Sequence, residues 1–324
     1  MRQNCQNNIV NIFASTQDPL TKSGECVTIN LLSKIAMKGA VTENRDGHFM
    51  DKQRKDELCE IARQIRIGII DAVHSAKSGH PGGSLSIADV LAYLYFEEMN
   101  IDPKNPKASG RDRMVLSKGH CAPGLYAALA LRGYFPVEDL KTFRHTTSYL
   151  QGHPDMKHTP GVDMSSGSLG QGASVSCGMA LASKIDASPR RIYAILGDGE
   201  TQEGEVWEAA MFAAHYKLSN LCWLVDFNGL QIDGKITDVM NPLPYDKKFE
   251  AFGWNVVECN AHDFDSIEAA YQAARACTDK PTVIISHSVK GKGVSFMENQ
   301  VSWHGAAPND EQYAVAMHDL GVEL

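Results

Sequence analysis

The chain has 324 residues, of which 43% are hydrophobic, which is enough to bury the core of one large domain or two small ones. Its formal net charge of -8 argues against nucleic acid or an anionic membrane as a partner, because an acidic surface without a concentrated basic patch would be repelled by both. No stretch approaches the roughly 20 apolar residues needed to cross a bilayer, and no apolar targeting segment follows the first charge. We therefore expect a cytoplasmic protein that binds neither nucleic acid nor membrane.

The eight cysteines are widely spaced and form no C-x-x-C pair. This spacing argues against a zinc or redox site and indicates buried free thiols in a reducing compartment.

The first 49 residues are rich in Asn, Thr and Ser, contain few aromatic residues and show no sustained hydrophobic period. This composition predicts a poorly ordered amino-terminal extension before a folded domain at 50–324, and Met50 is a candidate for the true start. From Asp51 onward the pattern changes, because Leu58, Ile61, Ile65 and Ile69 recur at helical spacing.

Helical patterns and short apolar runs then alternate along the chain. The expected helices span 87–98, 122–132, 171–185, 205–215 and 266–276, and the expected strands span 114–116, 191–196, 221–225, 254–258 and 282–286. This alternation predicts an α/β fold with a doubly wound, mostly parallel sheet and helices on both faces. Ligands of such folds bind at the carboxyl ends of the strands, and the long His- and Gly-rich connection at 139–166 is a further candidate region.

The sharpest motif begins where the second expected strand ends, at Gly197-Asp198-Gly199, and Asn228 follows the next strand. Two neighbouring parallel strands would release an oxygen ligand each at the same edge of the sheet, which suits a hard cation such as Mg²⁺. Glycines beside Asp198 would let the backbone approach a diphosphate closely. A tight turn is the alternative for the glycine motif alone, and Asn228 makes the cation site the better interpretation.

This stretch resembles the thiamine diphosphate motif, which opens with Gly-Asp-Gly and closes with Asn. The resemblance implies the thiamine-diphosphate-binding fold. It also implies that Asp198, Asn228 and the backbone carbonyl of Leu230 bind Mg²⁺, or another divalent cation such as Ca²⁺ or Mn²⁺, with Gly199 beside the cofactor.

Five further segments resemble the transketolase family, in the family's order and over nearly all of the chain from residue 51 to 310. They are Ser78-Gly79-His80-Pro81-Gly82-Gly83, Leu116-Ser117-Lys118-Gly119-His120, Gly152-His153-Pro154-Asp155, Ser166-Gly167-Ser168-Leu169-Gly170-Gln171-Gly172 and Ser302-Trp303-His304-Gly305-Ala306.

The resemblance assigns roles to four histidines. It implies that His80, His153 and His304 face the substrate channel as catalytic groups, and that His120 and His304 reach the cofactor diphosphate. Imidazole suits the movement of protons on a sugar near neutral pH. A satisfied structural histidine is the alternative at any one of these positions.

Two more contacts to the cofactor follow from the same resemblance. Gly167, Ser168 and Leu169 would wrap it, and Lys290 would add a cationic contact, with a solvated basic turn as the alternative for Lys290. The glycines after residue 166 are not spaced as in a dinucleotide fingerprint, so we do not expect a nicotinamide site.

Gly83 stands where some family members have a serine that binds the cofactor, so one contact is expected to be missing. Glu203 and Glu208 resemble glutamates that meet across a dimer interface in the family, and favourable charge near a helix start is their alternative interpretation.

About twenty residues follow the fifth segment, far fewer than the roughly 100 to 150 of a further domain. The resemblance therefore implies the amino-terminal subunit of a split transketolase. A separate carboxyl-terminal subunit would bring the pyrimidine-binding domain, the activating glutamate and the sugar-phosphate arginines, and two copies of each subunit would form a heterotetramer. The implied reaction transfers a two-carbon ketol unit from a ketose phosphate to an aldose phosphate.

Three alternatives remain open. The enzyme could act on an unusual sugar, such as a sulfo-sugar or branched-sugar ketose. A deoxyxylulose-phosphate synthase fragment would share the first histidine and the Gly-Asp-Gly motif, but the His153 and His304 segments argue against it. A non-catalytic thiamine diphosphate-binding module is the third alternative.

Overall fold

A computed structural model describes residues 50–323, so the predicted amino-terminal extension lies outside the described residues. The first helix, α2 (Lys52–Ala76), begins after Asp51, whose carboxylate accepts a hydrogen bond from the backbone N–H of Arg54 at 2.8 Å. This side-chain cap satisfies one of the donors that a helix start leaves without a partner. The helix buries the apolar face that the sequence predicts.

The predicted parallel sheet is confirmed. Its five strands are β1 (Arg113–Leu116), β2 (Ile192–Gly197), β3 (Leu221–Phe227), β6 (Asn255–Asn260) and β7 (Thr282–His287). They lie in the order β1-β2-β3-β7-β6, and every neighbouring pair is parallel. All the carboxyl ends therefore meet at one edge.

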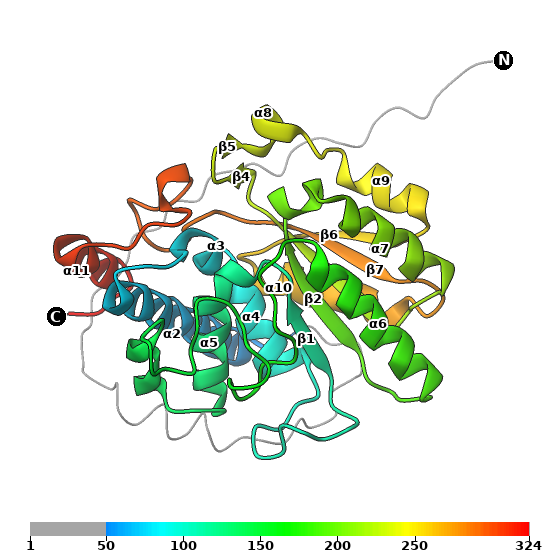
Figure 1. Cartoon of the computed structure of the whole chain (residues 1–324), viewed down its shortest axis with the longest axis horizontal. Helices are drawn as coiled ribbons and strands as arrows, with labels where there is room; N and C mark the ends of the chain where they lie inside the picture. The colour runs from blue at the N-terminus through cyan, green and yellow to red at the C-terminus, as the bar shows by residue number, and fades with distance from the viewer. Residues whose placement is uncertain (1–49, 324) are drawn as a thin grey trace. The chain divides into compact units, whose positions relative to one another are not determined.

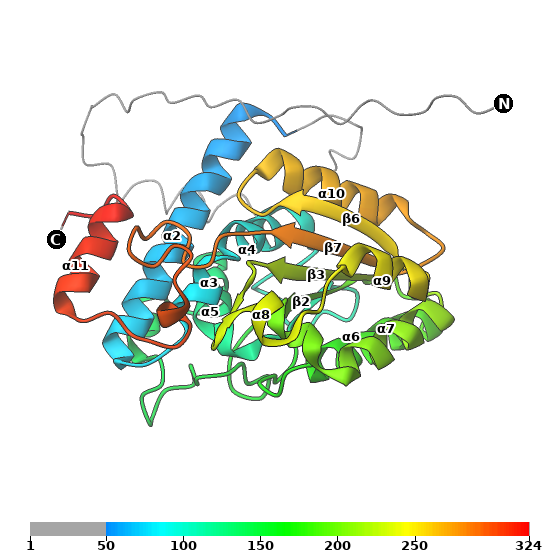
Figure 2. The ribbon, with the colours of Figure 1, turned by 90° about the horizontal axis from the view of Figure 1, so that it is seen from above.

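Helices cover both faces of this sheet (Figures 1 and 2). One core contains the buried side chains of α2, α4 (Ala88–Tyr93), α5 (Ala122–Arg132) and α10 (Phe264–Ala276). The other contains those of α6 (Gln171–Ile185), α7 (Gly204–His215) and α9 (Tyr245–Phe252). Strand residues alternate between the two cores, as Tyr193 and Ala194 do, because successive side chains of a strand point to opposite faces.

The predicted helices at 122–132 and 171–185 have the predicted bounds, and the other strands and helices are shifted by one or two residues at an end. The predicted helix at 87–98 is helical but not uniform. It is α4 followed by a π-helical turn, η1 (Leu94–Glu98). The backbone N–H of Met99 donates to the carbonyl of Leu94, five residues earlier, and Met99 itself has an extended backbone.

Several elements were not predicted. They include α3 (Pro81–Leu85), α8 (Ile236–Met240), α9, α11 (Asp310–Asp319) and an antiparallel hairpin of β4 (Leu230–Gln231) and β5 (Gly234–Lys235). The short helical turns η2 (Gly119–Cys121), η3 (Val137–Thr142), η4 (Gly199–Gln202) and η5 (Val301–Trp303) complete the described elements. Within residues 50–323, no helix is long and apolar enough to span a membrane.

Candidate active site

The carboxyl ends of four adjacent strands bring the predicted segments together. Lys118 and His120 follow β1, Asp198 follows β2, Asn228 follows β3 and Lys290 follows β7. These ends are neighbours because β1, β2, β3 and β7 are consecutive in the sheet.

Asp198 is buried, with 3% of its surface exposed. Its two carboxylate oxygens accept hydrogen bonds from the backbone N–H groups of Gly199, at 2.8 Å, and Gly229, at 2.6 Å. Burial and the nearby Asp226 carboxylate raise its pKa to about 7, while these backbone hydrogen bonds oppose the rise. A divalent cation here would remove the cost of the buried negative charge.

Asn228 is held in one orientation by its neighbours. Its side-chain N–H donates to Asp226 at 3.0 Å, and its side-chain oxygen accepts from the backbone N–H of Leu230 at 3.1 Å. Asp198, after β2, accepts from the backbone N–H of Gly229, which is the residue that follows Asn228 after β3. The amide oxygen of Asn228 and the Asp198 carboxylate therefore lie close to the same short segment.

Asp226 is the centre of a buried polar network that was not predicted. It accepts hydrogen bonds from Lys118 at 2.6 Å, from Ser86 at 2.7 Å, and from Ser288. Burial alone would raise the pKa of Asp226, but the Lys118 ammonium and these hydrogen bonds hold it below its ordinary value. The carboxylate is thus an acceptor for Asn228.

Lys290 connects the hairpin to a histidine. Its ammonium donates to the carbonyl of Leu230 at 3.3 Å and lies 3.0 Å from Nδ1 of His304. Because an ammonium can only donate, Nδ1 of His304 is the acceptor and Nε2 carries the proton of the neutral ring. Lys290 is 2% exposed, so the alternative of a solvated basic turn is wrong.

Three of the predicted histidines form one cluster. The ring centroids of His80 and His120 lie 5.2 Å apart, those of His80 and His304 5.5 Å, and those of His120 and His304 5.2 Å. Nδ1 of His80 is buried and has no hydrogen-bond partner among the described residues. Since buried polar atoms are nearly always paired, this orphaned nitrogen indicates a position for a ligand.

The cluster is electrically neutral at neutral pH. Burial is the main cause that lowers the pKa of His80 and of His120 to about 4 and that of His304 to about 3. Lys290 lowers all three further, and Lys118 adds to the effect on His120. Neutral imidazoles can each donate one hydrogen bond and accept another, which suits recognition of hydroxyl and phosphate groups.

His153 lies beside the Gly167 segment instead of within the three-ring cluster. A methyl group on Gly167 would come within 3.2 Å of the His153 ring, and one on Gly119 would come within 2.8 Å of the Gly167 backbone nitrogen. Ser166 donates to the carbonyl of Leu116 at 2.6 Å, which fixes the segment over the end of β1.

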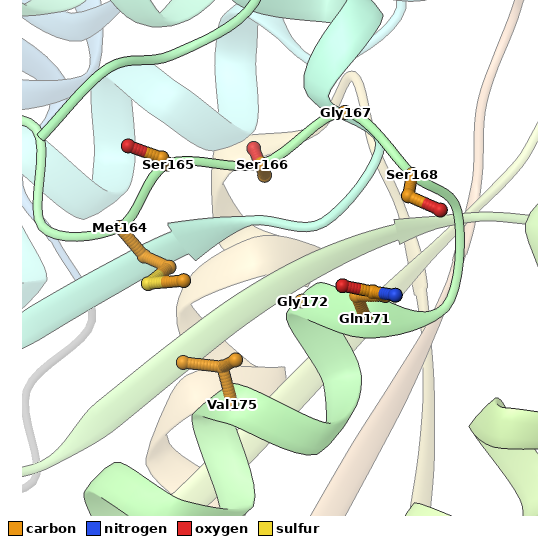
Figure 3. Close-up of a pocket in the computed structure, with 8 residues that line it drawn as sticks. All are labelled: Met164, Ser165, Ser166, Gly167, Ser168, Gln171, Gly172 and Val175. Carbon is orange, nitrogen blue, oxygen red and sulfur yellow. The ribbon is translucent and has the colours of Figure 1, made fainter.

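Gly167 and Ser168 also line a cavity of about 190 Å³ at the start of α6 (Figure 3). Met164 and Val175 give it an apolar side, and the hydroxyl of Ser168 and the side chain of Gln171 give it a polar one. Leu169 is 36% exposed and is not among its lining residues.

Glu200, which was also not predicted, forms hydrogen bonds with residues of three of the predicted segments. It is 2% exposed and accepts a hydrogen bond from Ser117, and its two oxygens also accept from the backbone N–H groups of Gly170 and Gly197, both at 2.9 Å. Burial raises its pKa, and the hydrogen bonds oppose the rise.

The structure supplies a physical reason for Gly83. A methyl group there would lie 2.8 Å from the sulfur of Cys121, which is completely buried. Cys121 therefore fills the space that a serine side chain would need.

No group of three or more His, Cys, Asp or Glu side chains in residues 50–323 is arranged to hold a metal ion. The predicted metal ligands are of another kind, because they are the carboxylate of Asp198, the amide oxygen of Asn228 and the backbone carbonyl of Leu230. These hard oxygen donors fit Mg²⁺, which keeps some positions for water or phosphate oxygens.

A parallel sheet whose carboxyl edge carries an acidic turn, neutral imidazoles and a buried lysine defines an α/β protein with a polar site at the ends of its strands. A family model described as "Transketolase, thiamine diphosphate binding domain" matches residues 58–324. The chain belongs to the transketolase family, of which it forms the thiamine diphosphate-binding part.

Two similar proteins are separate subunits. The chain is 46% identical over 275 residues to a 6-deoxy-6-sulfo-D-fructose transketolase subunit of Clostridium sp. (strain MSTE9), covering 85% of this chain and 99% of that one. It is 41% identical to one of the subunits of the apulose-4-phosphate transketolase of Phocaeicola vulgatus, covering 79% of this chain and 91% of that one.

Other relatives, described simply as transketolases, match over less than half of their length. The human enzyme is 40% identical over 260 residues, covering 80% of this chain and 41% of the human protein. The crystal structure of transketolase from Campylobacter jejuni superposes with a TM-score of 0.78 at 36% identity, covering 85% of this chain and 44% of that one. The prediction of an amino-terminal subunit of a split transketolase is thereby confirmed.

The individual roles predicted for the site residues remain predictions. The structure brings Asp198, Asn228, Lys290 and three histidines to one edge of the sheet. Sequence reasoning missed Asp226, Glu200, Ser86 and Ser288. Two of them stand beside residues of the predicted motif, because Glu200 follows Gly199 directly and Asp226 lies two positions before Asn228.

Proposed function

We propose that this subunit holds magnesium thiamine diphosphate at the carboxyl edge of its sheet. Together with a separate chain, it would transfer a two-carbon ketol unit from a ketose phosphate to an aldose phosphate. The observation that carries the proposal is the meeting of three neutral imidazoles with Lys290 and the Asp198–Asn228 turn at one edge.

The residues present fit this cofactor. Asp198, the oxygen of Asn228 and the carbonyl of Leu230 would hold the cation, which could be Mg²⁺, Ca²⁺ or Mn²⁺. His120 and His304 would contact the diphosphate, with Lys290 as a cationic contact. The backbone at Gly167–Leu169 would wrap the cofactor. When bound, the thiazolium ring of the cofactor supplies a carbon nucleophile for a ketone.

The histidines would form hydrogen bonds with the sugar and transfer its protons. Nδ1 of His80 is buried and accepts no hydrogen bond from residues 50–323, and His304 has a proton on Nε2 because its Nδ1 accepts from Lys290. One ring can thus receive a hydroxyl proton while another donates to a carbonyl or hydroxyl oxygen. His153, beside the Gly167 segment, would add a further contact in the channel.

The partner would be a carboxyl-terminal transketolase subunit with the pyrimidine-binding domain. The two similar proteins described as subunits support a two-chain enzyme, and we propose a heterotetramer. Glu203 and Glu208 are both exposed, as residues at a contact between subunits would be in the separate chain.

A particular observation favours a substrate other than the common sugar phosphates. The relative that shares 46% identity is described as acting on 6-deoxy-6-sulfo-D-fructose, and another on apulose 4-phosphate. A sulfo-sugar or branched-sugar ketose is therefore the second candidate donor. We propose a cytoplasmic location, since all six cysteines within the described residues are free thiols.

The decisive experiment reconstitutes the full chain with its partner subunit, Mg²⁺ and thiamine diphosphate, and measures ketol transfer from fructose 6-phosphate, 6-deoxy-6-sulfo-D-fructose and apulose 4-phosphate to an aldose phosphate. Transfer by the pair and none by the single chain is expected. Turnover by the single chain would contradict the split arrangement. A pair that binds the cofactor but transfers nothing from any donor would favour a non-catalytic module.

A further inference from the structure

A second buried polar cluster lies outside the site, where α2, α4 and the turn before α10 meet. Its members are Arg66, Asp89 and His262. Arg66 and Asp89 are buried, with 9% and 7% of their surfaces exposed. They form a bidentate ion pair, in which Nη1 lies 3.1 Å from Oδ1 and Nη2 donates to Oδ2. Nδ1 of His262 lies 2.7 Å from the same carboxylate.

The hydrogen bonds of His262 determine its tautomer. The backbone N–H of Val289 donates to Nε2 of His262 at 2.9 Å. A backbone N–H can only donate, so Nε2 is unprotonated, and the proton on Nδ1 is donated to Asp89. Burial alone would raise the pKa of Asp89, but His262 and Arg66 lower it, which keeps this acceptor ionised.

The cluster contacts the chain on both sides of Lys290. His262 receives the N–H of Val289, and Nε of Arg66 donates to the carbonyl of Lys292 at 3.1 Å. Lys290 itself extends from this segment to His304 and the carbonyl of Leu230. The two backbone contacts thus bracket the residue whose ammonium enters the site.

A buried ion pair is a weak source of stability, because the desolvation of two charges offsets most of their attraction. Its value here is geometric. Arg66 and His262 direct single, defined hydrogen bonds at two backbone groups, and loops that carry binding residues need such anchors to keep their geometry.

We propose that Arg66, Asp89 and His262 form a clamp that positions Lys290 for its contact with an anionic ligand, with His262 as the key positioning residue. The ligand class is the diphosphate of a cofactor, so the clamp rests on the proposed function. Asp89 orients both partners, Arg66 fixes one side of Lys290, and His262 fixes the other.

The test compares His262→Ala with His262→Gln in the full chain assembled with its partner subunit. Glutamine can replace both hydrogen bonds, since its amide N–H donates to Asp89 and its oxygen accepts from Val289. His262→Ala should weaken binding of thiamine diphosphate, measured by calorimetry with Mg²⁺, by about tenfold, the effect of one lost hydrogen bond to a positioned group. His262→Gln should recover most of the affinity, and His318→Ala, at an exposed helical histidine, should bind as the unsubstituted chain does.

Two spectroscopic readouts are independent of the cofactor. In the unsubstituted chain, ¹⁵N shifts should show His262 with a protonated Nδ1 and an unprotonated Nε2. Exchange of the Val289 amide hydrogen should be slow, should accelerate in His262→Ala, and should be slow again in His262→Gln. A proton on Nε2 would overturn the clamp, even where His262→Ala fails to fold.

Failure of the clamp and failure of the proposed function give different results. If the unsubstituted chain and its partner bind no thiamine diphosphate while His262 shows the expected tautomer and protection, the proposed function is wrong and the backbone contact stands. If the unsubstituted chain binds the cofactor and His262→Ala binds equally well, the clamp is wrong.

Discussion

Asp226 accepts a hydrogen bond from the side-chain N–H of Asn228 at 3.0 Å, which fixes the amide oxygen of Asn228 on the other side of its side chain. Asp226 can do this because Lys118, 2.6 Å away, balances its charge in a completely buried position. A buried ion pair beneath the edge of the sheet therefore orients a residue of the proposed metal site.

Removing either member of this pair should be costly. Asp226→Ala leaves Lys118 as an uncompensated buried charge, so the free energy of unfolding should fall by about 3 to 5 kcal/mol. The double variant Lys118→Met with Asp226→Leu should lose much less, although it should still bind Mg²⁺ poorly because Asn228 is no longer oriented. Urea unfolding of the two variants measures the difference, and equal losses would show that the pair is not coupled.

Asp198→Ala should abolish the Mg²⁺ dependence of thiamine diphosphate binding, because it removes the one carboxylate of the predicted oxygen set. Calorimetry measures this, with Asp279→Ala, an exposed aspartate before β7, as the matched control. Since the pKa of Asp198 is about 7, Mg²⁺ binding to the unsubstituted chain near pH 6 should also release a proton. Unchanged binding by Asp198→Ala would count against the metal assignment.

Stability should fall as the pH drops from 6.5 toward 4. The folded pKa of His120 is about 4, below its ordinary value of 6.5, so in this range the unfolded chain binds a proton that the folded site excludes. His80 and His304 act in the same direction, and Asp198, whose folded pKa is raised, opposes them.

Denaturation at pH 7.5 and pH 5 measures this effect. His120→Asn should reduce the loss of unfolding free energy between the two pH values by roughly 1 to 2 kcal/mol, given about 1.4 kcal/mol per pKa unit and some solvent screening. The same loss in the variant and the unsubstituted chain would contradict a buried neutral His120.

Gly83→Ser should destabilise the subunit by about 1 to 3 kcal/mol, because its Cβ would meet the buried sulfur of Cys121 at 2.8 Å. The double variant with Cys121→Ala should recover most of this loss, because the smaller side chain frees the space. Thermal unfolding of both variants checks the expectation, and a double variant as unstable as Gly83→Ser would show that the sulfur is not the obstacle.

The fold class and most of the strands and long helices follow from the amino-acid sequence alone. A short apolar run and a helical pattern are local properties of a sequence, and they mark β2 and α6 directly. The sequence also identified Asp198 and Asn228 as candidates, because each follows a predicted strand. It identified His120 and Lys290 because their segments resemble those of the transketolase family.

Which groups act together depends on how the chain packs in three dimensions. Asp226 and Lys118 are 108 positions apart, Asp89 and His262 are 173 apart, and no local pattern links them. The first pair meets because β1, β2 and β3 are consecutive in the sheet, and the second because α4 packs beside α10 and the turn that precedes it. Burial then forces each charged group to find a partner, and burial is a property of the packed molecule that a sequence window does not contain.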